Sequence, residues 1–388
     1  MEENNSVNNS KSNIIKVLIF FLIVIIIATL FAFYLIDTDF HAQLNELIFR
    51  KNVIENTSNI IEINTDSNPY VYAFDKYVTV LSKNTLTIYN QDSSEHLKLD
   101  VSITKPYSQS NDKYLALSES GGNKAYLITS EGIKWEKDVE GDIYRVSVNE
   151  NGYVSVILKN TTYKSIVIVY DVEGNELFKT YLAKSYAICS EISGNNKLLA
   201  VGQIDYTGTV VKSIVKIIAM DTAQNNSQQS IVYTYESESS KILNNIRFND
   251  KNEAICMFDS YVQKITDSSD ERAYDVTSND MFVDINLKNN IVILTKENSG
   301  LFSYQYQVNF KNNMGKSDNL YILENDVPKK LKVSNNIICI YFAGELRIVN
   351  SNGWLLKKYE TYTEIQDIVI GSNLIGIVYN NKIEVVSL

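Results

Sequence analysis

The amino-acid sequence predicts an all-β protein, a β-propeller of eight four-stranded blades that follows one transmembrane helix. Three observations carry this prediction. Residues suited to pleated sheets are abundant, with 26 Tyr and 14 Phe against only 3 Pro. A polar turn followed by an apolar strand recurs eight times between Asp75 and Ile377. A single uncharged apolar segment lies near the N-terminus, from Val17 to Ile36.

The composition of the chain limits its class of partner. Hydrophobic residues make up 45% of the sequence, which indicates a folded domain. The formal net charge of −10 argues against nucleic acid as a ligand, because phosphate binding needs clustered Lys and Arg. The cysteines Cys189, Cys256 and Cys339 are too few and too far apart for a disulfide framework, and each lies in an apolar run that predicts burial.

Residues 14–36 are predicted to form an uncleaved transmembrane signal anchor. As a helix, Val17–Ile36 would span roughly 30 Å, about the thickness of a bilayer core. The segment is longer than the apolar core of a cleaved signal peptide and lacks a small-x-small cleavage site. Lys11 and Lys16 precede it and acidic residues follow it, so the positive-inside rule predicts a cytoplasmic N-terminus and an extracellular C-terminal part.

The rest of the chain divides into three predicted parts. Residues 1–13 form a short cytoplasmic tail, residues 37–57 a stalk or linker, and residues 58–388 an extracytoplasmic propeller. Within the linker, Leu44, Leu47 and Ile48 have helical spacing. This spacing predicts one or two helical turns at the membrane surface, or alternatively a continuation of the anchor helix.

The recurring element is a polar turn that enters a strongly apolar strand. Its copies are Asp75–Val80, Asp112–Leu117, Asn151–Val156, Asn195–Ala200, Lys251–Cys256, Asn289–Leu294, Asn335–Ile340 and Ser372–Ile377. A period near 40 residues with four short strands per unit is typical of a propeller. Eight copies predict eight blades. Seven blades with one false copy, or a pair of β-sandwiches, are the alternatives.

A second element, a hairpin with a glycine in its turn, follows several copies. It is clearest in Tyr126–Trp135, Val169–Phe178 and Ile348–Leu356. The glycines Gly132, Gly174 and Gly353 are expected to supply the positive φ that such turns require.

The ends of the propeller are predicted to close the ring together. The last unit has only three strands, at Ile365–Ile370, Leu374–Tyr379 and Lys382–Val386, whereas Asn59–Asn64 is a strand with no unit of its own. We expect Asn59–Asn64 to complete the last blade, because its backbone would otherwise leave an open sheet edge.

One interval between copies is long, and the excess lies in Gly202–Ser240. This excess, which includes the polar tract Thr222–Ser230, is predicted to form an extended hairpin with a solvated tip. Such a protrusion either carries contacts to a partner or is a plain surface loop.

The Gly-turn-Trp ends of the units, above all Thr129–Trp135, resemble the repeats of quinoprotein-like (PQQ-like) propellers. The order of anchor, stalk and propeller resembles uncharacterised membrane-anchored propellers of clostridial and related Gram-positive bacteria, and the Asn-, Ile- and Lys-rich composition agrees. The resemblance implies a fold, not an activity. Quinone-binding relatives have an adjacent-cysteine disulfide and a Trp floor, whereas here no cysteines are adjacent and the tryptophans are Trp135 and Trp354. Non-enzymatic relatives that assist envelope assembly through protein contacts are the better analogue.

The residues suggest no particular reaction. Of the two histidines, His41 lies beside the predicted membrane segment and His96 reads as a surface residue, so no Ser-His-Asp set is evident. Asp267–Glu271 lacks the spacing of a calcium loop, and Ser120–Asn123 reads as a hairpin turn. Tyr304 with Tyr306, and Tyr233 with Tyr235, alternate as packing residues on a sheet face, although they could also stack on sugar rings.

No catalytic, cofactor-binding or metal-binding residue is therefore assigned from the sequence, and no cofactor is expected. The favoured hypothesis is a binding or scaffold module for envelope proteins or cell-wall polymer. The alternative is an extracytoplasmic enzyme, either a quinoprotein-like oxidoreductase or a glycan-active hydrolase or lyase, because a glycosidase pair can be distant in sequence. A signalling role is disfavoured because the 13-residue tail has no room for an output domain.

Overall fold

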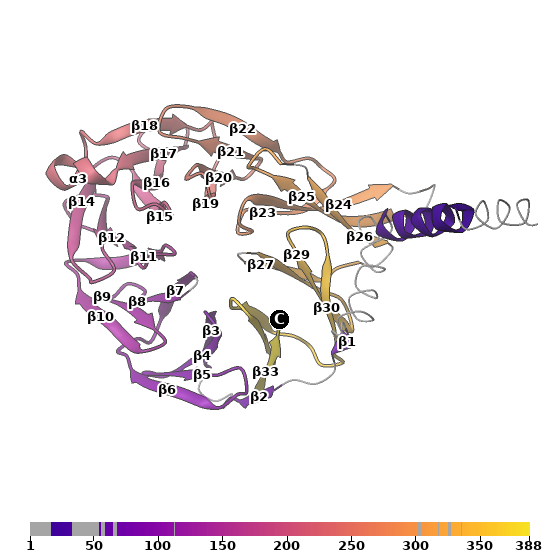
Figure 1. Ribbon diagram of the computed structural model, residues 1–388. Coiled ribbons are helices and arrows are strands. Elements are labelled where there is room, and N and C mark those ends of the chain that lie inside the picture. Colours follow the sequence, from indigo (N-terminus) through magenta and orange to yellow (C-terminus); the bar gives the residue numbers. More distant parts are fainter. Residues whose placement is uncertain are drawn as a thin grey trace, which may run out of the picture.

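The fold is described from a computed structural model, which describes residues 17–32, 54–55, 59–64, 68–111, 113–298, 300, 304–316, 318–324, 327–334 and 336–388. Within these residues the strands form eight sheets arranged as a ring of blades (Figure 1). The prediction of an eight-bladed propeller with four-stranded blades is confirmed, and the alternatives with seven blades or two sandwiches are wrong.

Blades 1 to 4 follow one another along the chain, and each runs from an inner to an outer strand. Blade 1 consists of β3 (Tyr70–Phe74), β4 (Tyr77–Ser82), β5 (Thr85–Tyr89) and β6 (Glu95–Asp100). Blade 2 consists of β7 (Pro106–Asn111), β8 (Tyr114–Glu119), β9 (Lys124–Thr129) and β10 (Gly132–Asp138). Blade 3 consists of β11 (Asp142–Val148), β12 (Val154–Lys159), β13 (Ser165–Tyr170) and β14 (Glu176–Leu182). Blade 4 consists of β15 (Tyr186–Ile192), β16 (Leu198–Asp205), β17 (Lys212–Ala219) and β18 (Ile231–Glu236), with helix α3 (Met220–Asn226) between its last two strands.

Blades 5 to 8 continue the same pattern. Blade 5 consists of β19 (Leu243–Phe248), β20 (Ala254–Phe258), β21 (Tyr261–Ile265) and β22 (Asp270–Asp275). Blade 6 consists of β23 (Asp280–Asp284), β24 (Asn290–Asn298), β25 (Tyr304–Asn312) and β26 (Asn319–Glu324). Blade 7 consists of β27 (Lys330–Ser334), β28 (Ile337–Tyr341), β29 (Glu345–Asn350) and β30 (Leu355–Glu360). Blade 8 consists of β31 (Asp367–Ile370), β32 (Leu374–Val378) and β33 (Lys382–Ser387), and its outer strand is β2 (Asn59–Glu62).

Each copy of the repeated turn leads from the inner strand of a blade into its second strand. The inner strands therefore all run in the same direction, and the eight turns lie on one face of the ring, which we call the turn face. The loops that join one blade to the next lie on the opposite face, which we call the loop face. Gly132, Gly174 and Gly353 adopt φ values of 129°, 80° and 76° in the outer hairpin turns, as the sequence predicts.

The N-terminal strand closes the ring. β2 pairs antiparallel with β33, placing Asn59 opposite Val385 and Glu62 opposite Lys382, so the prediction for Asn59–Asn64 is confirmed. Ile61 of this strand is only 3% exposed and packs in the cluster between blades 8 and 1. A further two-residue strand, β1 (Ile54–Glu55), pairs parallel with β30 of blade 7. These two residues lie in the segment predicted as a stalk or linker, so the last part of that segment pairs with the propeller.

The hydrophobic core consists of eight separate clusters, each between two neighbouring blades. The second strand of each blade is apolar and almost fully buried, because a neighbouring blade covers each of its faces; β28, for example, is Ile-Ile-Cys-Ile-Tyr and fully buried. The third strands vary, from the fully buried β13 to β25, in which buried and half-buried residues alternate. Burying one such aliphatic side chain contributes about 1.5–3 kcal/mol. The stability of the ring therefore depends on every blade having two neighbours.

The long interval Gly202–Ser240 contains the extended hairpin that the sequence predicts, because β16 and β17 pair over eight residues and the tip between them is exposed. The polar tract Thr222–Ser230, however, lies outside this tip. Its first part belongs to α3, whose Met220 and Ala223 are buried against blade 3. Only these two apolar positions face the core, which is too few for a helical period to show in the sequence. The remaining excess in Gly202–Ser240 comes from β16 and β17, which pair over eight residues each.

A helix covers residues 17–32, and its side chains are exposed throughout. Among the residues that the structure describes, no helix combines the length and the apolar character needed to cross a membrane. His41 and the proposed helical turns at Leu44–Ile48 lie outside the described residues.

Candidate functional site

The residues that the sequence singled out for chemistry are dispersed over the ring. His96 is exposed on β6, where its ring stacks on Tyr77 with 4.8 Å between ring centroids and its Nε2 lies 3.0 Å from the carbonyl oxygen of Ser130. Ser120–Asn123 is the turn between β8 and β9. The contacts of His96 are those of surface packing, and Asn123 directly precedes Lys124, which pairs with Glu136 on the sheet.

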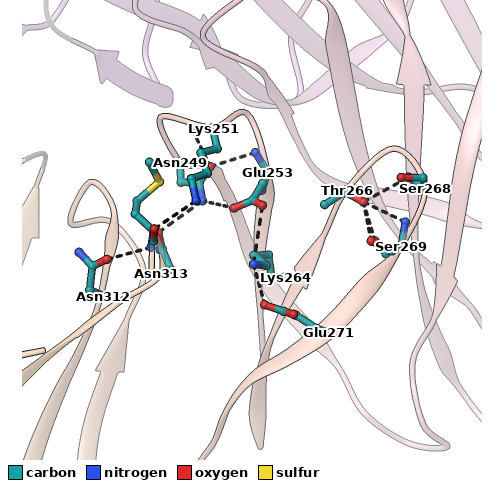
Figure 2. Close-up of polar contacts among 11 residues, drawn as sticks. Asn249, Lys251, Glu253, Lys264, Thr266, Ser268, Ser269, Glu271, Asn312 and Asn313 are labelled. Atoms are coloured by element: carbon teal, nitrogen blue, oxygen red, sulfur yellow. Dashed lines mark hydrogen bonds and ion pairs between the residues drawn. The ribbon is translucent and has the colours of Figure 1, made fainter. Parts of the chain in front are cut away.

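The acidic stretch Asp267–Glu271 covers the exposed turn after β21 and the first two residues of β22 (Figure 2). Thr266 and Ser269 close this turn by hydrogen bonds between their own atoms. Asp270 accepts a hydrogen bond from Gln263 Nε2 at 2.7 Å, and Glu271 pairs with Lys264 at 2.6 Å. Since Asp270 and Glu271 are paired with different neighbours on the sheet and Asp267 accepts a hydrogen bond from Ser268, the stretch does not assemble an oxygen cage. Within the described residues no group of three or more His, Cys, Asp or Glu could hold a metal ion.

The three cysteines are free and buried, as predicted. Cys189 and Cys256 lie in the cluster between blades 4 and 5, and Cys339 lies in the one between blades 7 and 8. Burial raises the pKa of Cys189 to about 12 and raises the pKa of Cys256 and Cys339 as well. These thiols are therefore protonated and unreactive at neutral pH.

The two tyrosine pairs act mainly in packing. Tyr306 is buried in the cluster between blades 6 and 7, and Tyr235 packs edge-on against Phe258 at 5.8 Å between centroids. Tyr233 bonds to Asp270 of the next blade, and Tyr304 stays exposed with the Lys296 ammonium 3.7 Å from its ring centroid.

A cavity of about 360 Å³ lies on the turn face. Turns from blades 2 to 7 line it, so it opens where the inner strands end around the ring axis. Asparagine dominates its lining, with Asn111, Asn149, Asn195, Asn249, Asn252, Asn286, Asn289, Asn313 and Asn336. We call this set the asparagine rim.

The asparagines occur at these turns for a local reason. The side-chain oxygen of Asn249 accepts hydrogen bonds from the backbone N–H groups of Lys251 and Glu253, both at 3.0 Å, and so closes its own turn (Figure 2). Asn149 does the same with Asn151 and Tyr153. A short side chain that bonds two and four residues ahead is what favours Asn in such turns.

The same asparagines join neighbouring blades through their amide nitrogens. Asn149 Nδ2 donates to the carbonyl oxygen of Ser193 at 2.9 Å and to Asn196 Oδ1 at 2.6 Å, both in blade 4. Asn249 Nδ2 reaches Asn313 Oδ1 in blade 6 at 3.4 Å. Asn149 and Asn249 are therefore held in fixed, buried positions with their hydrogen bonds made inside the protein, whereas Asn195 and Asn336 of the rim are exposed.

The floor of the cavity is an ion pair between a buried glutamate and a half-buried arginine. Glu191, only 6% exposed, pairs with Arg247 at 2.9 Å and accepts a hydrogen bond from Ser147 Oγ at 2.7 Å. Arg247 also donates to Asn286 Oδ1 at 3.0 Å, and Asn286 bonds to Asp284 below it. Burial raises the pKa of Asp284, and the hydrogen bonds from Asn286 offset only part of this effect.

A second set of charges bridges the mouth of the cavity. Lys288 of blade 6 pairs with Glu150 of blade 3 at 3.0 Å and with Asp250 of blade 5 at 2.9 Å. Burial opposes the charged form of Lys288, but Asp250 and Glu150 outweigh it and raise the pKa of the ammonium. Gly194 provides the space for this bridge, because a Cβ there would lie 2.6 Å from Glu150 Oε1.

The charged groups that line the cavity are paired with one another. Each carboxylate that lines it, Glu150, Glu191 or Asp250, is already paired with Lys288 or Arg247. None of these three lining carboxylates is therefore an unpaired group that faces the cavity as a general acid or base would. The groups that remain free to contact a ligand are amides of the asparagine rim. These amides can form hydrogen bonds to a polar ligand without a net charge.

Sequence reasoning found the turns that form this site but not the site. Their asparagines appeared as turn residues in the repeat, and the sequence does not show that six of these turns meet around one recess. The recurrence of Asn at the same position of several repeats was the available signal.

Comparison with solved structures confirms the propeller fold. BamB from Moraxella catarrhalis is similar with a TM-score of 0.51 at 10% identity, over 87% of this chain and 100% of that one. The C-terminal WD40 domain of Sif2 has a TM-score of 0.55 at 9% identity, over 86% and 99%. Sqt1 from Chaetomium thermophilum, solved bound to the N-terminus of the ribosomal protein L10, has a TM-score of 0.51 at 9% identity, over 86% and 100%. At such identities the likeness shows the fold alone.

A comparison with curated proteins finds no match. Residues 49–388 match a family described as a family of unknown function, DUF5711. This match takes in β1 and all eight blades, and the chain therefore belongs to that family.

Proposed function

We propose that this protein is a membrane-anchored, extracytoplasmic binding module that takes an extended segment of an envelope protein at the asparagine rim. The observation that carries the proposal is the cavity in which every lining carboxylate is already paired and amides supply the remaining hydrogen bonds. An extended peptide presents alternating N–H and C=O groups without net charge, and fixed amides match such groups.

Two further points support the proposal. Sqt1, a propeller of similar fold, was solved with a protein N-terminus bound, so a ring of this kind can hold a peptide. The location outside the membrane is supported by the sequence, in which the apolar segment Val17–Ile36 follows Lys11 and Lys16.

The proposal is tested by capturing the partner from intact cells. Cells that carry the full-length protein are treated with a membrane-impermeant crosslinker, and the proteins that copurify are identified. Asn336→Trp places a bulky ring in the rim, and we expect it to abolish capture of the partner. Asn373→Trp is the matched control, because Asn373 holds the same position of the repeated turn in blade 8 but does not line the cavity.

Three outcomes contradict the proposal. Capture that survives Asn336→Trp shows that the partner binds elsewhere, and capture lost equally in both variants shows that the effect is not local. If no specific partner is captured, the protein-binding function is wrong and the enzyme alternative remains. The paired carboxylates of the cavity give that alternative no support.

A further inference from the structure

A second surface of distinct chemistry lies on the loop face, over blades 3 and 4. Tyr186 and Tyr206 stack there with 5.4 Å between ring centroids and 16° between ring planes. The Lys164 ammonium lies over both rings, 5.3 Å and 5.5 Å from their centroids. Beside them the Lys159 ammonium lies 5.3 Å from the ring centroid of Tyr144. We call these five residues the tyrosine–lysine platform.

Strand direction explains why the five residues share one face. Tyr144 and Tyr186 lie at the beginnings of the inner strands β11 and β15, which end at the turn face. Lys159 ends β12 and Lys164 immediately precedes β13, so both flank the hairpin turn on the loop face. Tyr206 follows β16 directly. The platform and the cavity are therefore on opposite faces of the ring.

The long hairpin of blade 4 raises one side of the platform. β16 and β17 pair over eight residues, from Leu198–Ala219 to Asp205–Lys212, whereas β12 and β13 of blade 3 pair over six. Two extra residues extend the hairpin by about 7 Å beyond its neighbour. Tyr206 at its tip is 44% exposed, and Tyr144 on the other side is 40% exposed.

The lysines of the platform lack ion-pair partners. Of the described residues, no carboxylate lies within ion-pair distance of Lys159 or Lys164, although both belong to a protein with a net charge of −10. By contrast, Lys288 on the turn face pairs with two carboxylates. Uncompensated ammonium groups beside exposed aromatic rings suit a ligand with both ring faces and negative charge.

We propose that the tyrosine–lysine platform binds an acidic glycan, a polymer of sugar rings that carry carboxylate or phosphate groups. The C–H face of a pyranose ring would stack on Tyr206 or Tyr144, and the acidic groups would pair with Lys159 and Lys164. This site is separate from the asparagine rim, and its test does not depend on the peptide-binding function.

The test measures binding of defined oligosaccharides to the full-length protein in nanodiscs of neutral phosphatidylcholine. The acidic probes are fluorescent oligogalacturonate, which carries carboxylates, and phosphomannan oligosaccharide, which carries phosphates. Maltooligosaccharide supplies neutral rings and polyglutamate supplies negative charge without sugar. We expect one or both acidic glycans to bind more tightly than either control, and their affinity to fall as salt is raised.

Substitutions at the platform locate the binding. Tyr206→Ala removes one stacking ring and is expected to weaken binding about five- to tenfold, from an aromatic contact of about 1–1.5 kcal/mol. Lys164→Gln is expected to weaken binding and to reduce its salt dependence. Tyr304→Ala is the matched control, because Tyr304 in blade 6 is 46% exposed and also has a lysine over its ring. Tyr144→Ala serves as a second ring variant if Tyr206→Ala lowers the melting temperature.

The outcomes separate the possible ligands. If only oligogalacturonate or only phosphomannan binds, the proposal stands and the acidic group is identified. Equal binding of polyglutamate shows a site for any polyanion, and equal binding of maltooligosaccharide shows that the lysines are irrelevant; either result overturns the proposal. It is also overturned if neither acidic glycan binds, or if Tyr304→Ala weakens binding as much as the platform variants.

Discussion

Glu384 shows how one residue ties two blades together at the closure of the ring. It lies on β33, is 8% exposed, and accepts hydrogen bonds from Tyr359 of blade 7 at 2.6 Å and from Tyr379 at 3.0 Å. Lys382 donates to its other oxygen at 2.6 Å. Burial opposes the charged form of Glu384, but these three partners outweigh it and hold its pKa below the usual value of 4.5.

The lowered pKa of Glu384 predicts a loss of stability in acid. Because the pKa is lower in the folded than in the unfolded state, the contribution is complete above pH 4.5 and is lost as the pH falls through the folded-state pKa. Glu384→Gln is expected to lower the free energy of unfolding at neutral pH by about 1–3 kcal/mol. The variant should also lose less stability than the wild type on acidification. Thermal unfolding followed between about pH 3 and pH 7 measures both effects.

Glu364, which is exposed in the loop before β31, provides the control for this prediction. Glu364→Gln should change the free energy of unfolding by no more than about 0.5 kcal/mol. If Glu384→Gln leaves both the stability and its pH dependence unchanged, then the buried hydrogen bonds do not stabilise the closure.

At the scale of single elements, the short strand β2 is the one that closes the ring. Its four residues pair with β33 and complete blade 8, so the N-terminal end of the propeller is held by the C-terminal end. Without β2, the edge of β33 would be open and the cluster that contains Ile61, between blades 8 and 1, would lose part of its cover.

Two adjacent residues of β2 allow a matched test of closure. Ile61 is 3% exposed and Ile60 is 47% exposed, because successive strand residues point to opposite faces. Ile61→Asp is expected to lower the melting temperature by on the order of 5 °C, since it places an unpaired charge between two blades. Ile60→Asn should have little effect, because Ile60 is exposed and an uncharged polar residue introduces no repulsion with Glu384 opposite it, and deletion of residues 58–64 should destabilise the whole ring. An unchanged melting temperature in Ile61→Asp or in the deletion would show that the ring closes without β2.

At the scale of the whole molecule, the ring presents two faces of different chemistry. The turn face carries amides and internally paired charges, whereas the loop face carries stacked tyrosines with unpaired lysines. If the chain is anchored as we propose, one rigid ring offers separate surfaces to a protein segment and to an acidic glycan.

Membrane topology can be tested by labelling an introduced cysteine in intact cells. All three native cysteines are buried and should not react, so the background is low. Ser268→Cys places a thiol in the exposed turn after β21, and we expect a membrane-impermeant maleimide to label it without cell lysis. Ser6→Cys, in the predicted cytoplasmic tail, should react only after lysis. The reverse pattern would show that the propeller lies inside the cell.

The sequence by itself determined the number of blades and the closure of the ring. Each repeat contains its own turn residues and its own apolar strands, so the period and the strand left without a unit at Asn59–Asn64 could be read locally. The burial of Cys189, Cys256 and Cys339 followed from the apolar runs around them. The sequence could not predict α3, because only Met220 and Ala223 of that helix face the core and no helical period results.

Only the tertiary structure decided where the sites lie. The Glu150–Lys288 bridge joins residues 138 positions apart. The tyrosine–lysine platform brings Tyr144 of blade 3 and Tyr206 of blade 4 to one surface, each with a lysine over its ring. Nothing in the sequence distinguishes these two lysines from the others. Neither site has a local motif, because each is formed by single residues from several repeats that meet only when the ring closes. The fold of a repeat protein is encoded within each repeat, whereas its binding surfaces depend on the differences between repeats and on how the ring places those differences side by side.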